Sequence, residues 1–158
     1  MKLIKNILVP IDFSDYSKNA LRYAVQFAKN FQAKMYLIYV VEPMIYPADF
    51  SMGQVAIPSM DADLQNRAEE ELKNLANNFV DSSLELETLI KTGKPFVEIN
   101  ETAKEIDADL IIMATHGHTG VEHLLFGSTA EKVVRKAPCP VLTLREPIKG
   151  FSFSNKSK

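Results

Sequence analysis

Short apolar runs alternate along the chain with longer segments whose apolar residues recur every three or four positions. The runs are typical of buried strands; residues 35–41, for example, are too few for a typical helix and are rich in β-formers. The five runs lie at residues 7–9, 35–41, 84–89, 110–113 and 140–145. The pattern therefore predicts five strands with a helix between each consecutive pair.

The intervening segments have the spacing of amphipathic helices. A cap at Ser14 or Asp15 precedes the first, Asp61 starts the second, Pro95 marks the third, and residues 127–130 open the fourth. The side chains expected to face the core are Ala20, Leu21, Ala24, Phe27, Ala28 and Phe31 in the first helix, Leu64, Ala68, Leu72, Leu75 and Phe79 in the second, and Phe96, Ile99, Ala103 and Ile106 in the third.

Strands and helices that alternate in this way favour one parallel sheet with helices on both faces. Right-handed crossovers restrict the arrangement, and the strand order 3-2-1-4-5 is expected. The predicted fold class is a single α/β domain, Rossmann-like, over residues 1–147. Residues 148–158 are polar and are predicted to form a disordered tail.

The net charge and the cysteine content indicate which classes of binding partner and which cellular compartment are expected. The net charge is −2, with both signs intermixed, which argues against nucleic acid as the main partner because that binding needs a basic stripe. Cys139 is the single cysteine, so no disulfide forms within the chain, as suits a reducing compartment. No signal peptide and no apolar run near the ~20 residues of a membrane span is found. We expect a cytoplasmic protein that does not enter a membrane.

Residues 43–60 interrupt the regular pattern. The segment contains three prolines and a glycine together with many apolar residues, which are too numerous for a solvated linker. Three interpretations stay open: a lid, a surface for a protein partner, or a flap over the core.

Two loops should meet at the ligand-binding point of the predicted sheet. In such sheets ligands bind beyond the carboxyl ends of the strands, where the strand order reverses. That point lies between the first and fourth strands, so it is formed by residues 10–14 and by residues 114–120. Both loops carry polar residues or glycines, including Asp12 and Gly117.

Residues 127–130, Gly-Ser-Thr-Ala, provide the features of a phosphate site. The N–H groups at a helix start and the positive end of its dipole suit a phosphate, and Ser128 and Thr129 add hydroxyl donors. Asp12, at the tip of the first strand, is placed to accept from sugar hydroxyls. Glycine and serine are also common helix caps, so these residues alone do not establish a site. Their place at the predicted switch point favours a nucleotide.

Three stretches of the sequence, taken together, form a pattern that is more specific than any one of them alone. They are residues 7–14 (Ile-Leu-Val-Pro-Ile-Asp-Phe-Ser), residues 114–120 (Ala-Thr-His-Gly-His-Thr-Gly) and residues 127–142, from Gly-Ser-Thr-Ala-Glu-Lys-Val to Pro-Cys-Pro-Val-Leu. Together they resemble the universal stress protein family, from about Lys5 to Arg145. The resemblance implies a fold like that of the adenine nucleotide alpha hydrolases and a stress-response regulator that binds ATP or AMP. Any Mg²⁺ would be held through the nucleotide's phosphate oxygens.

The ATP-binding branch of that family has the motif Gly, two residues, Gly, nine residues, Gly, then Ser or Thr. Gly117, Gly127 and Ser128 match its later positions, and Ala114 replaces its first glycine. If the φ angle of Ala114 is negative, alanine is tolerated there. If it is positive, alanine is strained and binding is in doubt.

The resemblance implies three groups of site residues. The residues beside adenine and ribose would be Pro10, Ile11, Asp12 and Val40. The Asp12 carboxylate would bind the ribose, and the backbone of Val40, at the end of the second strand, would contact adenine. Those lining the adenosine are Met113 and Ala114. Those that would hold the phosphates are Gly117, Gly127, Ser128 and Thr129, and His116 is expected in the site as well. The family also typically forms homodimers through the last strand, here Val141 to Leu144, and an exposed apolar edge strand favours such pairing.

Other chemistries find less support in the sequence. His116, His118 and His123 lie on one loop with no evident fourth ligand for a transition metal. No Walker Gly-Lys-Ser is present, and no spacing indicates a nucleophile beside its base, so efficient catalysis is not expected. Cys139 is interpreted as a packed thiol.

The sequence leaves three functions open. The first is a dimeric regulator that senses adenine nucleotides. The second is a nucleotide-free dimeric scaffold that docks an unknown protein through residues 43–60. The third is a slow adenine-nucleotide hydrolase.

Overall fold

The computed structural model describes residues 3–43, 58–116 and 127–145. The strands within these ranges are β1 (Asn6–Pro10), β2 (Lys34–Val41), β3 (Leu86–Thr92), β4 (Leu110–Ala114) and β5 (Val141–Leu144). The helices are α1 (Asp15–Phe31), α2 (Pro58–Phe79), α3 (Pro95–Glu105) and α4 (Ser128–Lys136). None of these helices combines the length and the apolar character that crossing a bilayer requires.

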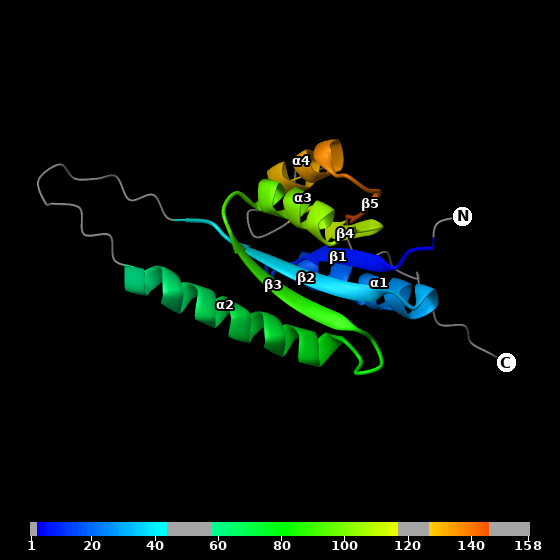
Figure 1. The fold of residues 1–158 in the computed structure, drawn as a ribbon, viewed down its shortest axis with the longest axis horizontal. Helices are drawn as coiled ribbons and strands as arrows, with labels where there is room; N and C mark the ends of the chain where they lie inside the picture. The colour runs from blue at the N-terminus through cyan, green and yellow to red at the C-terminus, as the bar shows by residue number, and fades with distance from the viewer. Residues whose placement is uncertain (1–2, 44–57, 117–126, 146–158) are drawn as a thin grey trace, which may run out of the picture.

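The strands form one parallel sheet in the order β3-β2-β1-β4-β5, which confirms the predicted fold class. Helices α1 and α2 pack on one face of the sheet, and α3 and α4 pack on the other (Figure 1). The strand order reverses between β1 and β4. The carboxyl ends of these two strands therefore lie side by side, as the sequence predicted.

The central strands bury both of their faces. In β1, Ile7 and Val9 belong to the core under α1 and α2, whereas Leu8 belongs to the core under α3 and α4. All three side chains are fully buried. Successive side chains of a strand point to opposite faces, so a strand covered on both sides reads as a continuous apolar run.

The edge strand β3 ends later than the sequence predicted. Apolar alternation suggested residues 84–89, but β3 runs from Leu86 to Thr92, and its pairing with β2 continues to Val41↔Thr92. Backbone hydrogen bonds to the neighbouring strand set this end, and they do not require an apolar side chain.

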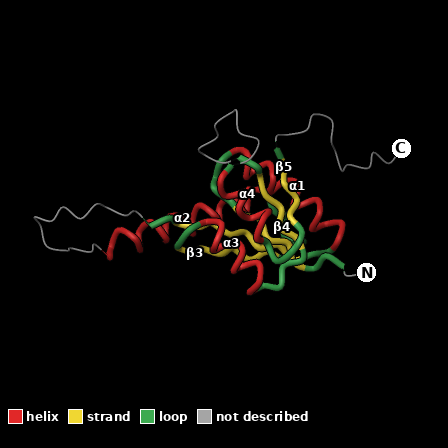
Figure 2. The backbone as a smooth tube through the Cα atoms, turned by 90° about the horizontal axis from the view of Figure 1, so that it is seen from above, coloured by secondary structure: helices red, strands yellow, loops and turns green. Residues whose placement is uncertain are grey.

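Two residues predicted to face the core are exposed. Phe31, the last residue of α1, is 42% exposed, and Leu64 of α2 is 39% exposed. Helix α2 has 22 residues and is about 33 Å long, whereas the eight residues of β2 span about 26 Å. The first turns of α2 therefore extend beyond the sheet, as Figures 1 and 2 show.

Helix α2 also begins three residues before the predicted Asp61, at Pro58. Proline suits a first helical turn because it has no N–H to leave unpaired. The irregular segment 43–60 thus contributes its last three residues to a helix, and residues 44–57 lie outside the described residues, as does the predicted tail at 148–158.

Asp109 joins the amino ends of β1 and β4. Its Oδ2 accepts hydrogen bonds from the backbone N–H groups of Lys5 at 2.8 Å and Asn6 at 3.1 Å. The Asn6 side chain donates to the Ile106 carbonyl at 3.0 Å. These bonds fasten β1 to the turn between α3 and β4, at the edge of the sheet opposite to the switch point.

Replacing Asp109 by alanine should lower the free energy of unfolding by about 1–2 kcal/mol, because two backbone donors lose their acceptor. Urea denaturation would measure the change. Asp63→Ala, at an exposed position of α2, is the control and should change stability by less than about 0.5 kcal/mol. Equal effects of the two substitutions would contradict a role for Asp109 in holding the strands together.

Candidate functional site

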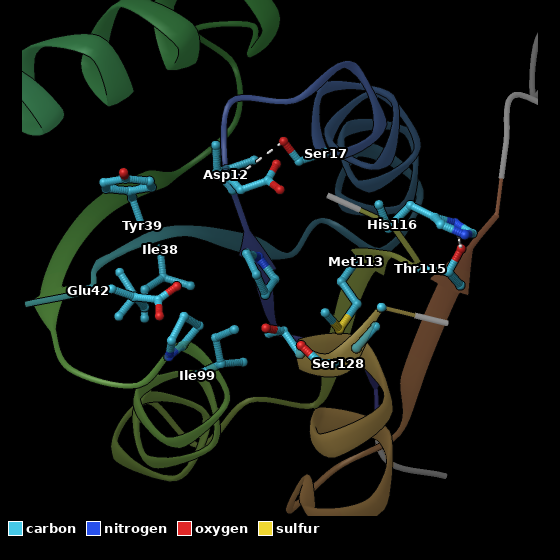
Figure 3. Close-up of a pocket in the computed structure, with 18 residues that line it drawn as sticks. Asp12, Ser17, Ile38, Tyr39, Glu42, Ile99, Met113, Thr115, His116 and Ser128 are labelled. Atoms are coloured by element: carbon cyan, nitrogen blue, oxygen red, sulfur yellow. Dashed lines mark hydrogen bonds between the residues drawn. The ribbon is translucent and has the colours of Figure 1, made fainter. Parts of the chain in front are cut away.

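A cavity of about 290 Å³ opens at the carboxyl ends of β1, β2 and β4. Its walls come from these strand ends, from the first turns of α3 and α4, and from Ser17 in α1 (Figure 3). Small-molecule sites typically enclose about 300–1,000 Å³, so the described part of the cavity suits a small ligand. Its position is the switch point of the sheet.

The end of β1 supplies Pro10, Ile11 and Asp12 to the cavity wall. The Asp12 carboxylate is oriented by the start of α1: its Oδ1 accepts from the Ser14 N–H at 3.0 Å and from the Ser14 hydroxyl. A carboxylate has two oxygens that can together accept about four hydrogen bonds, which makes Asp12 a strong acceptor group in the cavity wall. The same Ser14 hydroxyl caps α1 by accepting from the Ser17 N–H at 3.2 Å.

The turn after Asp12 contains a left-handed residue. Phe13 has φ 64°, which is unfavourable for a bulky side chain and persists only where packing enforces it. Its ring packs against that of Tyr39, with the ring centroids 4.8 Å apart. This contact between tilted rings therefore holds the turn that directs Asp12 toward the cavity.

The end of β2 supplies Val40 together with Ile38, Tyr39 and Glu42. Ile38 and Val40 are buried and give this wall an apolar surface, which Ile99 of α3 continues. Burial raises the pKa of Tyr39 above its usual value, and the nearby carboxylates of Glu71, Asp12 and Glu42 raise it further.

The end of β4 contributes Met113 and Ala114. Ala114 lies in the strand, pairs with Leu144, and is not among the described residues with positive φ. Alanine is therefore unstrained at the position where the motif has glycine. The concern that a positive φ angle would strain alanine at this position therefore does not apply.

Thr115 and His116 follow β4. His116 Nδ1 lies 2.9 Å from Thr115 Oγ1, and the imidazole ring lies 5.7 Å from that of Tyr16 between centroids. Figure 3 shows the His116 ring beside Thr115, across the cavity from Tyr39 and Glu42. His116 thus lines the cavity, and its ring lies between Thr115, directly after β4, and Tyr16 of α1.

The first turn of α4 opens into the cavity with Ser128 and Thr129. Gly127 is its N-cap and, as a glycine, has no side chain with which to cap the helix. The first N–H groups of a helix have no intrahelical acceptor, and they point out of its amino end. This end of α4 can therefore donate to an anion in the cavity.

Gly127 is required by a close backbone contact and not by its dihedral angles. Its φ of −69° and ψ of 154° are open to any residue. Its N–H donates to the Thr115 carbonyl at 2.7 Å, and a Cβ at Gly127 would lie 3.1 Å from that same oxygen. The glycine lets α4 start directly against the end of β4.

The structure brings nearly all of the predicted site residues to this one cavity. Those that line it are Pro10, Ile11, Asp12, Val40, Met113, Ala114, His116, Gly127, Ser128 and Thr129. Gly117 lies outside the described residues. The lining residues that were not predicted as site residues are Ser17, Ile38, Tyr39, Glu42, Pro95, Ile99, Thr115 and Ala130. Glu42 could have been predicted, because it directly follows β2 at the same edge of the sheet as Asp12.

Within the described residues, no group of three or more histidine, cysteine or acidic side chains could hold a metal ion. His118 and His123 fall outside those residues.

The fold and the cavity define a doubly wound α/β protein with a cavity of small-molecule size at its switch point. A family model described as the universal stress protein family matches residues 3–145. The chain therefore belongs to the universal stress protein family, and so to the stress-response proteins, as the sequence motifs indicated.

Individual relatives agree with this assignment. A universal stress protein of Methanocaldococcus jannaschii is 38% identical over 150 residues, which are 93% of this chain and 85% of the relative. The universal stress protein UspA of Lactobacillus plantarum has a similar structure, with a TM-score of 0.70 and 29% identity over 92% of this chain and 100% of that one. A universal stress protein of Archaeoglobus fulgidus, solved in complex with dAMP, has a TM-score of 0.62 and 23% identity over 90% and 98% of the two chains.

Substituting Gly127 by alanine should lower stability by about 1 kcal/mol, because the added Cβ presses on the Thr115 carbonyl. Alanine is also a poor N-cap, so Gly127→Ser, which restores a good cap, separates the two causes. Thermal unfolding of both variants is the measurement. If serine were as stable as glycine, capping and not the close contact would explain the glycine.

Proposed function

We propose that this protein binds an adenine nucleotide in the cavity and acts as a ligand-controlled regulator in the stress response. The observation that carries the proposal is the amino end of α4, which opens into the cavity and has a glycine, with no side chain to offer, as its N-cap. Backbone N–H groups at a helix start hold phosphate without the help of a cation. The hydroxyls of Ser128 and Thr129 add donors at the same place.

The opposite walls suit a nucleoside. Ile38, Val40, Ile99 and Met113 offer apolar surface to a base, while the Asp12 carboxylate can accept from ribose hydroxyls. The orientation of Asp12 by Ser14 supports this role, because a fixed acceptor loses little conformational freedom on binding. The proposed nucleotide is ATP or AMP, and any Mg²⁺ would be coordinated by its phosphate oxygens.

The dAMP complex of the Archaeoglobus fulgidus protein demonstrates that one protein of this fold accepts an adenine nucleotide. At 23% identity that likeness bears on the fold, so the proposal rests on the cavity of this chain. The regulatory role follows if nucleotide binds two conformations with different affinity. We place the protein in the cytoplasm, because its single cysteine suits a reducing compartment.

Ser128→Pro tests the phosphate site directly. Proline is favoured at this first position of α4, and the φ of −69° and ψ of 154° at Gly127 suit a residue before proline. The substitution removes one N–H and one hydroxyl while the helix keeps its start. Calorimetry should give micromolar binding of AMP to the wild type and a loss of about ten-fold or more in the variant.

Ser128→Ala removes the hydroxyl alone and should lose less affinity than Ser128→Pro. Thermal unfolding of each variant controls for folding. If the wild type bound neither AMP nor ATP below millimolar concentration, the proposal would fail, and the nucleotide-free scaffold would replace it.

Ala114→Gly restores the glycine of the family motif. Because Ala114 already has an extended backbone in β4, the substitution should leave nucleotide affinity within about two-fold. The same calorimetric titration measures it. A gain of ten-fold or more would mean that the Ala114 methyl group obstructs the ligand.

We further propose a homodimer that pairs through β5, at the edge of the sheet. The Pro140 carbonyl accepts from the N–H of Ile111 in β4 at 3.0 Å, and the Leu144 carbonyl accepts from the N–H of Thr115, directly after β4, at 2.9 Å. Alternate residues of a strand direct their backbone groups to opposite sides, so those of Val141 and Thr143 point away from β4. An edge of this kind can pair with a second copy.

Thr143→Pro should convert the dimer to a monomer, because it removes an outward N–H without touching the β4 ladder. Thr143→Ala keeps the N–H and should stay dimeric. Sedimentation equilibrium distinguishes the two states. A dimeric Thr143→Pro protein, or a monomeric wild type, would refute pairing through β5.

A further inference from the structure

Two carboxylates lie in the wall of the cavity. Asp12 follows β1 and Glu42 follows β2, and they are the formally charged side chains among the described lining residues. Figure 3 shows Asp12 beside Ser17, Glu42 below Tyr39 at the left, and Ser128 at the start of α4. A ligand anion in this cavity therefore experiences acidic groups as well as the amino end of α4.

Tyr39 also lines the cavity and lies near both carboxylates. After burial, the charges that raise the pKa of its hydroxyl are those of Glu71 on α2, Asp12 and Glu42. A raised phenol pKa means that a further negative charge is disfavoured at this position. Burial is the larger cause of this shift, and the carboxylates of Glu71, Asp12 and Glu42 add to it.

The lysines of α4 are engaged elsewhere. Lys132 and Lys136 lie over the ring of Phe96, with Nζ 5.0 Å and 5.4 Å from its centroid. Arg135, on the same helix, pairs with Glu131 at 3.0 Å. These cations belong to the outer surface of α3 and α4, and they do not line the cavity.

We infer that the cavity selects adenine nucleotides by phosphate charge, favouring monophosphates over triphosphates, and that Glu42 is a residue that sets this preference. The inference rests on the proposed adenine-nucleotide site and names its ligand class. Backbone N–H groups bind one phosphate well, but each further phosphate adds charge that the two carboxylates repel.

The preference has a physical signature in its dependence on salt and Mg²⁺. A basic phosphate site loses ATP affinity as salt rises. Here the affinity of ATP relative to AMP should rise, since salt screens the repulsion between the carboxylates and the additional phosphates. Mg²⁺ should act in the same direction, because it neutralises part of the charge of ATP.

The experiment is a calorimetric titration of the full chain with adenosine, cyclic AMP, AMP and ATP, first in EDTA. At about 0.01 M salt, where the Debye length is about 30 Å, ATP should bind about ten-fold more weakly than AMP. The difference should shrink at about 1 M salt, where the Debye length is about 3 Å, and also with Mg²⁺ at low salt. Glu42→Gln, which keeps the shape of the side chain, should raise the ratio of ATP to AMP affinity about three-fold at low salt.

Glu70→Gln on the exposed surface of α2 is the matched control, because it removes the same charge away from the cavity lining and should leave the ratio unchanged. ATP binding more tightly than AMP in EDTA at low salt, or equal shifts in Glu42→Gln and Glu70→Gln, would overturn the inference while nucleotide binding stands. If no nucleotide bound the wild type, the proposed function and this inference would both fall.

Discussion

The hydrogen bond from the Gly127 N–H to the Thr115 carbonyl, 2.7 Å long, sets the geometry on which the site depends. Thr115 also donates its own N–H to Leu144, so the same residue joins the ends of β4 and β5 to the start of α4. A Cβ at residue 127 would lie 3.1 Å from the Thr115 carbonyl oxygen and would press on this junction. The close junction directs the amino end of a helix into the space beyond the sheet.

The other side of the cavity is organised by the turn after β1. Ser14 caps α1 and orients Asp12 with the same hydroxyl group, and the ring of Tyr39 supports the left-handed Phe13 between them. The carboxylate and the helix end thus face one cavity from separate elements. This arrangement gives the cavity an acidic part and a part rich in N–H donors.

Most of the fold could be predicted because burial on both faces leaves a simple trace in the sequence. The run at Ile7–Val9 marked a central strand, and the spacing from Ala20 to Ala28 marked a buried helix face. Leu64 was misassigned because periodicity identifies the apolar side of a helix but not how far the sheet beneath it extends. The end of β3 was misplaced because hydrogen bonding to β2 continues through polar residues.

The sequence by itself determined the strand order, the family, and most residues of the candidate site, because motifs at strand ends are local and the topology of the sheet places those ends together. Only the tertiary structure decided that Ala114 is unstrained, that Gly127 serves a backbone contact, and that Glu42 and Tyr39 belong to the cavity wall. Dihedral angles, interatomic distances and electrostatic fields depend on segments far apart in the chain, and no local pattern of residues records them.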